Sequence, residues 1–335
     1  MIERIAVIGG GAWGTALALT AARAGRHAVL WARDPETVAA VNQRAENPRY
    51  LPGIVLSPKL LATADLRVAE SADAIILAVP AQEVRAVAAM LAGHVRQGAP
   101  VVIAAKGIER RSGKRLSEVL TEVLPEGQPS VLSGPGFAGD VARGLPTAVT
   151  IAAADGDRAL ALCRALASAS FRPYAETDIA GVEIGGAVKN VLAIGAGVVV
   201  GAGLGASAHA ALVARGFAEL RRFADVNGAR PETLMGLSGL GDLVLTCSSP
   251  QSRNFAFGRM IGEGGDGTAR SALVEGVATA AIVREIARNK GVEMPVSDAV
   301  AGLIEGTIDV ARAVESLMNR PLRHEAEGPA AEARE

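Results

Sequence analysis

The amino-acid sequence predicts an α/β N-terminal domain with a mostly parallel sheet, followed by an all-α C-terminal domain. Two observations predict this fold class. Short apolar strand-like segments alternate with helix-like segments through the first half of the chain, which is typical of a parallel sheet covered on both faces. Beyond about residue 179 the strand signals stop, and segments rich in alanine, leucine and valine continue at helical spacing, interrupted by glycine clusters.

The elements of the first half follow one another in a regular order. The strands that we expect span residues 4–8, 27–32, 74–79, 100–104, 130–132 and 147–152, and the helices span residues 14–24, 35–44, 81–91 and 114–124. We expect residues 1–182 to form the first domain, residues 183–320 the helical domain, and the polar stretch 321–335 a flexible tail.

Composition excludes several classes of protein. The chain of 335 residues has 34 Lys and Arg against 35 Asp and Glu, so it lacks the basic surface of a nucleic-acid-binding protein. Its two cysteines, Cys163 and Cys247, form neither a disulfide framework nor a metal-binding motif. The start of the chain does not resemble a signal peptide. We therefore expect a cytoplasmic protein without a metal site.

A long uncharged run raises the question of a membrane. Residues 191–214 contain no Asp, Glu, Lys or Arg, and Gly197, Gly201 and Gly205 are spaced as in closely packed membrane helices. Glycine and alanine dominate the run, so its transfer into lipid would be weakly favourable. We interpret it as a helix buried in the core of the second domain, with no membrane span.

A glycine-rich turn follows the first predicted strand. Residues 9–14 fit the G-x-G-x-x-G pattern, and they open a helix within a β-α-β unit. In a Rossmann-type domain the first glycine permits the turn, the second admits a pyrophosphate, and the third lets the helix pack on the strand. The pyrophosphate lies on the amides of the helix N-terminus. The cofactor-binding residues that we predict here are Gly9, Gly11, Ala12, Trp13 and Gly14.

The end of the second strand bears on the choice of dinucleotide. NAD-binding domains carry an acidic residue there, which accepts hydrogen bonds from the ribose hydroxyls. In this chain Arg33 stands about at that position, and a guanidinium suits the 2′-phosphate of NADP. Asp34 would serve NAD if the strand were one residue longer. We predict NADP(H) as the preferred cofactor, with NAD(H) as the alternative.

Three further segments carry polar residues suited to chemistry. Lys106 follows a predicted parallel strand, and ligands of open α/β sheets collect outside the carboxyl ends of the strands. Lys189 and Asn190 lead into the uncharged run, where a lysine is hard to explain structurally. The third segment begins with Asp242 and Thr246 and continues to Ser252, Arg253 and Asn254.

Together these segments resemble a known family over nearly the whole chain apart from the tail. The chain is similar to the bacterial NAD(P)-dependent glycerol-3-phosphate dehydrogenases. The resemblance lies in the ordered segments GGGAWGTA, LWARDP, AAKGIE, SGPGFA, GGAVKNVLAIGAG, GLGDLVLTC, QSRN and VEG.

The resemblance implies a reaction and a role for each matching residue. The reaction is the reduction of dihydroxyacetone phosphate to sn-glycerol 3-phosphate, which supplies phospholipid synthesis. Lys189 matches the lysine that gives a proton to the carbonyl oxygen, and Lys106 matches one that contacts both substrate and cofactor. Asp242 and Thr246 match groups that orient the lysine and the substrate hydroxyls. The segment that holds the substrate phosphate and approaches the cofactor is matched by Ser252, Arg253 and Asn254.

Other matches concern the cofactor and the substrate. Ala138, Leu273 and Glu275 match further cofactor contacts, and Gly134 matches a substrate contact. At Gly136, also at the substrate, the family pattern calls for Ser or Thr. A hydroxyl contact is therefore missing, which we expect to affect substrate affinity more than the type of reaction.

Two other interpretations remain open from the sequence. One is a related helical-domain reductase of the β-hydroxyacid dehydrogenase type, whose carboxylate substrate would also bind an arginine. The other is a redox sensor that binds NADP without turnover, although a sensor has no need of a proton donor. The resemblance further implies a homodimer, while the glycine pattern of residues 197–205 would also suit packing within one domain.

Overall fold

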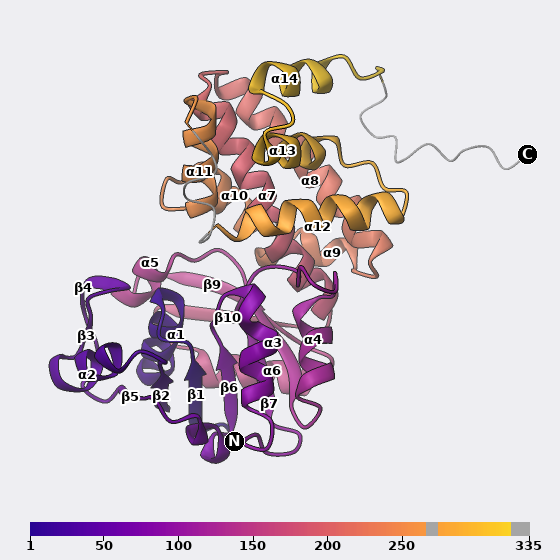
Figure 1. Cartoon of the computed structure of the whole chain (residues 1–335). Helices are drawn as coiled ribbons and strands as arrows, with labels where there is room; N and C mark the ends of the chain where they lie inside the picture. The colour runs from indigo at the N-terminus through magenta and orange to yellow at the C-terminus, as the bar shows by residue number, and fades with distance from the viewer. Residues whose placement is uncertain (266–273, 323–335) are drawn as a thin grey trace, which may run out of the picture. The chain divides into compact units, whose positions relative to one another are not determined.

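The computed structural model describes residues 1–265 and 274–322 (Figure 1). The chain divides into two compact units. The first comprises Met1–Ala187 with Ala229–Leu245, and the second comprises Val188–Gly228 with Thr246–Glu335. The boundary that we predicted after residue 182 falls inside one continuous helix, α7 (Ile179–Gly201). The predicted tail lies outside the described residues from residue 323 onward.

The first unit is built on a sheet of eight strands in the order β10-β9-β8-β7-β6-β1-β2-β5 (Figure 1). All neighbouring strands are parallel except β8 and β9, which are antiparallel, so the predicted mostly parallel sheet is confirmed. The strands are β1 (Arg4–Ile8), β2 (His27–Trp31), β5 (Leu61–Thr63), β6 (Ala74–Leu77), β7 (Pro100–Ile103), β8 (Gln128–Ser133), β9 (Thr147–Ala153) and β10 (Phe171–Glu176).

Helices cover both faces of this sheet because successive strand residues point to opposite sides. Ile5 and Val7 of β1 belong to one core cluster, and Ala6 and Ile8 belong to another. The helices and short hairpin strands of the first unit are α1 (Ala12–Arg23), α2 (Pro35–Arg44), β3 (Glu46–Asn47), β4 (Leu51–Val55), α3 (Val84–Met90), α4 (Leu116–Val123), α5 (Ala138–Arg143), α6 (Gly156–Leu166) and α9 (Pro231–Leu234).

The six strands that we expected do not complete the sheet. Two edge strands extend it, and both have weak sequence signals. β10 contains Pro173, which is tolerated at a sheet edge, and β5 is only three residues long. The intervening helices α5 and α6 were also missed. Residues 81–83 form a 3₁₀ turn before α3, and the helix expected from residue 114 begins at Leu116.

The second unit is helical, as expected (Figure 1). Within it, α13 packs against α8, α12 and α14. Its helices are the later part of α7, then α8 (Ala206–Val226), the end of α10 (Asp242–Ser248), α11 (Arg253–Gly262), α12 (Glu275–Asn289), α13 (Pro295–Glu305) and α14 (Val310–Met318).

The uncharged run 191–214 is not one helix, which corrects the expectation. Gly203 and Gly205 have φ angles of +68° and +91°, a region that favours glycine, and they separate α7 from α8. Of the residues that the structure describes, α7 alone is long and apolar enough to cross a membrane, and 89% of its most apolar window is buried inside the protein. That burial favours a core helix.

Candidate active site

The glycine-rich turn joins β1 to α1, and the three glycines of the pattern differ in their steric surroundings. Gly9 has φ +129°, and a Cβ there would lie 2.5 Å from the carbonyl oxygen of Ala78. A Cβ on Gly14 would lie 1.9 Å from the oxygen of Gly9, so only glycine lets α1 approach the turn this closely. At Gly11 a Cβ would meet nothing within 4 Å. The open side of the turn is thus at Gly11, where a pyrophosphate would approach.

The first turn of α1 offers a polar group that the described part of the chain leaves unused. Gly11 is the N-cap of α1, and Ala12 and Trp13 are its first two residues. The indole Nε1 of Trp13 is buried and has no hydrogen-bond partner among the described residues. Buried donors are nearly always satisfied in proteins. This orphan donor and the open side of Gly11 both fit a bound dinucleotide. Ala138, the other predicted cofactor residue of this unit, begins α5.

Charged residues gather where β2 ends. Arg33 is exposed and makes no hydrogen bond or ion pair with another described residue. Asp34 instead caps α2, accepting from the N–H of Glu36 and the hydroxyl of Thr37, and Arg49 lies 3.3 Å from its Oδ2. The hydroxyl of Thr37 is the foremost cause that lowers the pKa of Asp34. The carboxylate of Asp34 is therefore engaged within the protein.

Lys106, Gly134 and Asp242 meet beyond the carboxyl ends of β7 and β8. The ammonium of Lys106 donates to the carbonyl oxygen of Gly134 at 2.9 Å and to Oδ2 of Asp242 at 2.7 Å. Asp242 is 1% exposed, and it follows a π-helical turn, Leu237–Gly241. Such turns are frequent at functional sites. The structure therefore places three predicted site residues in direct contact.

The loop that carries Lys106 is held by an ion-pair network that sequence reasoning missed. Glu109 is buried, and Arg85 of α3 contacts its two carboxylate oxygens at 2.6 and 2.9 Å. This guanidinium lowers the pKa of Glu109, with further help from Ser112. The planar guanidinium of Arg85 thus forms a bidentate pair with the carboxylate, and such a pair fixes the relative orientation of the two side chains. The AAKGIE segment contained Glu109, but nothing in the sequence pointed to its partner.

In the second unit, Lys189 lies in the middle of α7 rather than before it. Lys189 is 6% exposed, and its ammonium donates to the hydroxyl of Thr246 at 2.6 Å. Thr246 belongs to α10 and is also buried. A lysine is rarely buried without a specific reason. The structure thus brings together two of the residues that we predicted to be catalytic.

A second set of polar residues surrounds the start of α11. Asn254 donates from Nδ2 to Oδ1 of Asn190 at 2.9 Å, and its own Oδ1 accepts from the N–H of Gly276 at 2.9 Å. Asn254 thereby joins α7 to the first turn of α12, which begins at the predicted cofactor residue Glu275. The predicted residue Leu273 lies outside the described residues.

The first residues of α11 themselves are arranged like an anion site. Ser252 is the N-cap, and its hydroxyl accepts from the N–H of Phe255 at 3.2 Å. Arg253 is exposed and makes no hydrogen bond or ion pair with another described residue. A helix N-terminus with an available guanidinium favours a phosphate group.

Glycines hold α11 tightly against α7. A Cβ on Gly197 would lie 2.1 Å from the oxygen of Phe255, and one on Gly258 would lie 1.9 Å from the oxygen of Ile194. Gly201 and Gly262 make equally close approaches to the facing helix. The glycine spacing of α7 therefore serves packing within one unit.

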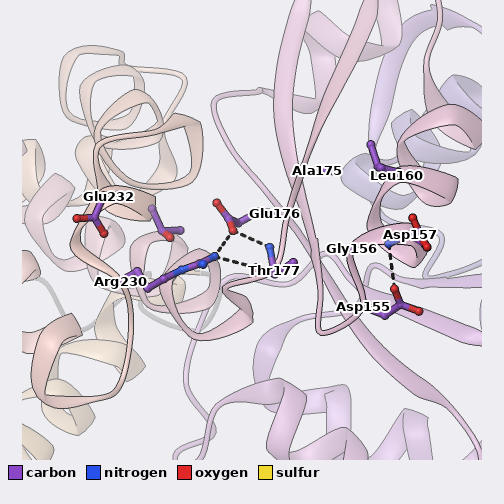
Figure 2. Close-up of a pocket in the computed structure, with 10 residues that line it drawn as sticks. Asp155, Gly156, Asp157, Leu160, Ala175, Glu176, Thr177, Arg230 and Glu232 are labelled. Atoms are coloured by element: carbon purple, nitrogen blue, oxygen red, sulfur yellow. Dashed lines mark hydrogen bonds and ion pairs between the residues drawn. The ribbon is translucent and has the colours of Figure 1, made fainter.

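The first unit also contains an open pocket that none of the predicted site residues lines. It has a volume of about 820 Å³ and lies between the start of α6, the end of β10 and the start of α9 (Figure 2). Arg230 pairs there with Glu176 and donates to Thr177, and Asp155 caps α6 (Figure 2). Its lining has four acidic residues against one arginine, which disfavours an anionic cofactor or substrate, so we do not place the active site here.

The glycine-rich turn on a parallel sheet, followed by a helical unit with a buried lysine, defines an NAD(P)-dependent oxidoreductase. Comparison with known proteins identifies the family. The models of the N-terminus and C-terminus of NAD-dependent glycerol-3-phosphate dehydrogenase match residues 4–159 and 178–315. The chain belongs to the NAD-dependent glycerol-3-phosphate dehydrogenase family.

Individual relatives agree with the family models. A glycerol-3-phosphate dehydrogenase (NAD(P)+) of Mesorhizobium japonicum is 54% identical over 323 residues, which cover 96% of this chain and 94% of that protein. The crystal structure of a glycerol-3-phosphate dehydrogenase from Coxiella burnetii has 36% identity and a TM-score of 0.89, covering 95% of this chain and 99% of that one. The enzyme from Saccharomyces cerevisiae has 27% identity and a TM-score of 0.83, covering 95% and 99%. Family membership decides against the β-hydroxyacid dehydrogenase and redox-sensor alternatives.

Proposed function

We propose that this chain catalyses the reversible reduction of dihydroxyacetone phosphate to sn-glycerol 3-phosphate with a nicotinamide dinucleotide. The observation that carries the proposal is Lys189, a buried lysine whose ammonium donates to the hydroxyl of Thr246. Family membership supports the substrate. The dinucleotide supplies the hydride when it is bound on the glycine-rich turn.

The residues of the chain divide the remaining work. Lys189 gives a proton to the carbonyl oxygen during reduction and takes it from the alcohol in the reverse direction. Thr246 orients its ammonium, and Lys106, held by Asp242 and the carbonyl of Gly134, contacts substrate and cofactor. The substrate lies against Gly134 and Gly136.

The start of α11 holds the phosphate of the substrate. Ser252, Arg253 and Asn254 form this subsite, with Arg253 also approaching the cofactor. The exposed guanidinium of Arg253 and the amides of the helix start support this assignment. Ala138, Leu273 and Glu275 complete the cofactor contacts, by the resemblance to the family.

The decisive experiment measures oxidation of NADPH and of NADH side by side, with and without dihydroxyacetone phosphate. Lys189→Ala should lower turnover by about 10²–10⁴-fold, the usual contribution of a general acid. The matched control is Lys290→Ala, because Lys290 is an exposed lysine of the same unit whose ammonium donates to the carbonyl oxygen of Val226. Wild-type protein that binds NADPH but shows no substrate-dependent oxidation would overturn the proposal.

We propose further that NADP(H) is preferred over NAD(H). The support is that Arg33 is exposed at the end of β2 while Asp34 is engaged in capping α2. Arg33→Asp should weaken NADPH binding and leave NADH binding almost unchanged. Arg44→Gln is the control, since Arg44 is an exposed arginine at the far end of α2 that pairs with Glu46. An unchanged ratio of the two dissociation constants in Arg33→Asp would remove Arg33 from the 2′-phosphate site.

We also propose a cellular location and an oligomeric state for the enzyme. Both cysteines are free and buried, which supports a reducing cytoplasm. There the product would supply phospholipid synthesis. We propose a homodimer on the basis of the family resemblance, and sedimentation velocity at micromolar concentration tests it.

A further inference from the structure

Asn47 is a buried polar residue beside the glycine-rich turn that no sequence motif had singled out. It is 0% exposed and is the last residue of β3, in the short hairpin that follows α2. The chain reaches this place because Ala45, the C-cap that follows α2, has φ +52° and turns the chain back toward α1.

The carboxamide of Asn47 holds the two parts of the cofactor turn. Its Nδ2 donates to the carbonyl oxygen of Gly10 at 2.9 Å and to the hydroxyl of Thr15 at 2.8 Å. Gly10 lies in the middle of the turn, and Thr15 lies on α1, where its N–H donates to the oxygen of Gly11 at 2.9 Å. One side chain therefore joins the turn to the helix that it opens.

The glycines of the turn have no side chain that could hold the turn in place. A Cβ on Gly10 would lie 2.5 Å from the Cβ of Ala32, so a larger residue is excluded there. Glycines have the greatest backbone freedom of all residues. A turn whose amides must point at a pyrophosphate gains affinity when another segment fixes its backbone beforehand.

The oxygen of the Asn47 carboxamide differs from the nitrogen in its surroundings. Its Oδ1 is buried and has no hydrogen-bond partner among the described residues. Buried acceptors without partners are destabilising, and each one in a native structure calls for an explanation. The two hydrogen bonds that Nδ2 donates to the turn and to α1 explain why an asparagine stands here despite the cost of its buried oxygen.

We propose that Asn47 is a positioning residue for the pyrophosphate site, which it orders by fixing the backbone at Gly10 against α1. It does not touch the cofactor. The inference rests on the proposed binding of a nicotinamide dinucleotide at the glycine-rich turn. Because NADH and NADPH share the pyrophosphate, the residue acts equally on both.

The test measures dissociation constants of NADPH and NADH by fluorescence titration, without turnover. Asn47→Ala should raise both constants by about five- to tenfold, as expected for the loss of one to two hydrogen bonds. The KM for dihydroxyacetone phosphate and kcat at saturating cofactor should stay unchanged. Thr15→Val, which removes only one of the two acceptors, should raise both constants by a smaller factor and provides a second variant if Asn47→Ala does not fold.

Asn42→Ala is the matched control for stability. Asn42 of α2 likewise makes two hydrogen bonds to backbone, with the N–H and the carbonyl of Ala62, but these bonds hold the edge strand β5. The Asn42→Ala variant should have a lower melting temperature than the wild type and unchanged dissociation constants for NADPH and NADH. Unchanged constants in folded Asn47→Ala or Thr15→Val, or an equal rise in Asn42→Ala, would overturn the inference. Wild-type protein that binds both dinucleotides without turnover would instead refute the proposed function and leave this test intact.

Discussion

Glu183 offers a quantitative test of the energetics of the first unit. It lies on α7 and is buried, and its two carboxylate oxygens accept from the N–H of Ser117 at 2.8 Å and from the Ser117 hydroxyl. Ser117 is in the first turn of α4, so Glu183, which is distant in the sequence, accepts a hydrogen bond from one of the unpaired N–H groups at the start of that helix. Burial raises the pKa of Glu183 from its ordinary 4.5 to about 7, because desolvation disfavours the carboxylate.

The raised pKa makes the stability of the wild type depend on pH. A carboxyl group whose pKa is higher in the folded state than in the unfolded state stabilises the folded protein while it is protonated. This stabilisation is complete below the unfolded-state pKa of 4.5 and is lost as the pH rises through the folded-state pKa of about 7. At about 1.4 kcal/mol for each pKa unit, the loss between pH 4 and pH 8 is about 3 kcal/mol.

Glu183→Gln removes this dependence and preserves the shape. The amide oxygen can accept from the N–H of Ser117, while the amide nitrogen donates to its hydroxyl, which accepts as well as donates. We therefore expect the free energy of unfolding of the variant, relative to that of the wild type, to rise by up to about 3 kcal/mol between pH 4 and pH 8. Urea unfolding followed by tryptophan fluorescence is the assay, since Trp13 and Trp31 are the two tryptophans of the chain and both lie in the first unit.

Glu219 provides the contrasting variant. It too is buried with its pKa raised to about 7, chiefly by desolvation, but its oxygens accept from the N–H groups of both Val296 and Ser297. An amide nitrogen placed there would face a backbone donor, so Glu219→Gln should destabilise the second unit at acidic pH. Parallel pH profiles for wild type and Glu183→Gln would show that Glu183 has the same pKa in the folded and unfolded states, and would refute the reasoning.

Two further predictions concern glycines. Gly136→Ser should fit, since its Cβ would lie 3.4 Å from Thr147 and 3.6 Å from Trp13, and the restored hydroxyl should lower the KM for dihydroxyacetone phosphate about three- to tenfold relative to Gly136→Ala. An equal KM in the serine and alanine variants would argue against a hydroxyl contact. Gly258→Ala should destabilise the second unit by about 3 kcal/mol or more in thermal unfolding, because its Cβ would overlap the oxygen of Ile194. The exposed Ala256→Ser on the same helix is the control, and similar melting temperatures would contradict the tight α7–α11 packing.

The features that the sequence predicted best depend on neighbours along the chain. The glycine-rich turn was identifiable because its strand, turn and helix are consecutive, and the steric demands at Gly9 and Gly14 lie within that unit or on the adjacent strand. The alternation of strands and helices predicted the parallel sheet for the same reason. The edge strands failed because a short or proline-containing strand carries almost no periodic signal.

The features that the sequence could not supply depend on contacts between distant segments. Asn47 donates to groups 37 and 32 residues away, and Glu109 pairs with an arginine 24 residues away. No local pattern distinguishes such residues from ordinary polar residues of a loop. The segment 229–245 presents the same difficulty, since it follows helices of the second unit yet packs with the first. The residues that contact Asn47 and Glu109 therefore become apparent only from the folded structure.

The charges of α7 show where sequence reasoning could have gone further. Glu183 and Lys189 are the only charged residues between Ile179 and Gly201, in a helix that is largely buried and, apart from Asn190, otherwise apolar. A charge that is removed from water is costly unless a specific group receives it, so each such residue must either satisfy another element or take part in chemistry. That argument selected Lys189, and it applied equally to Glu183. The structure separates the two roles: Glu183 satisfies the start of α4, whereas Lys189 donates to the hydroxyl of Thr246, a contact that orients the ammonium that we propose as the proton donor.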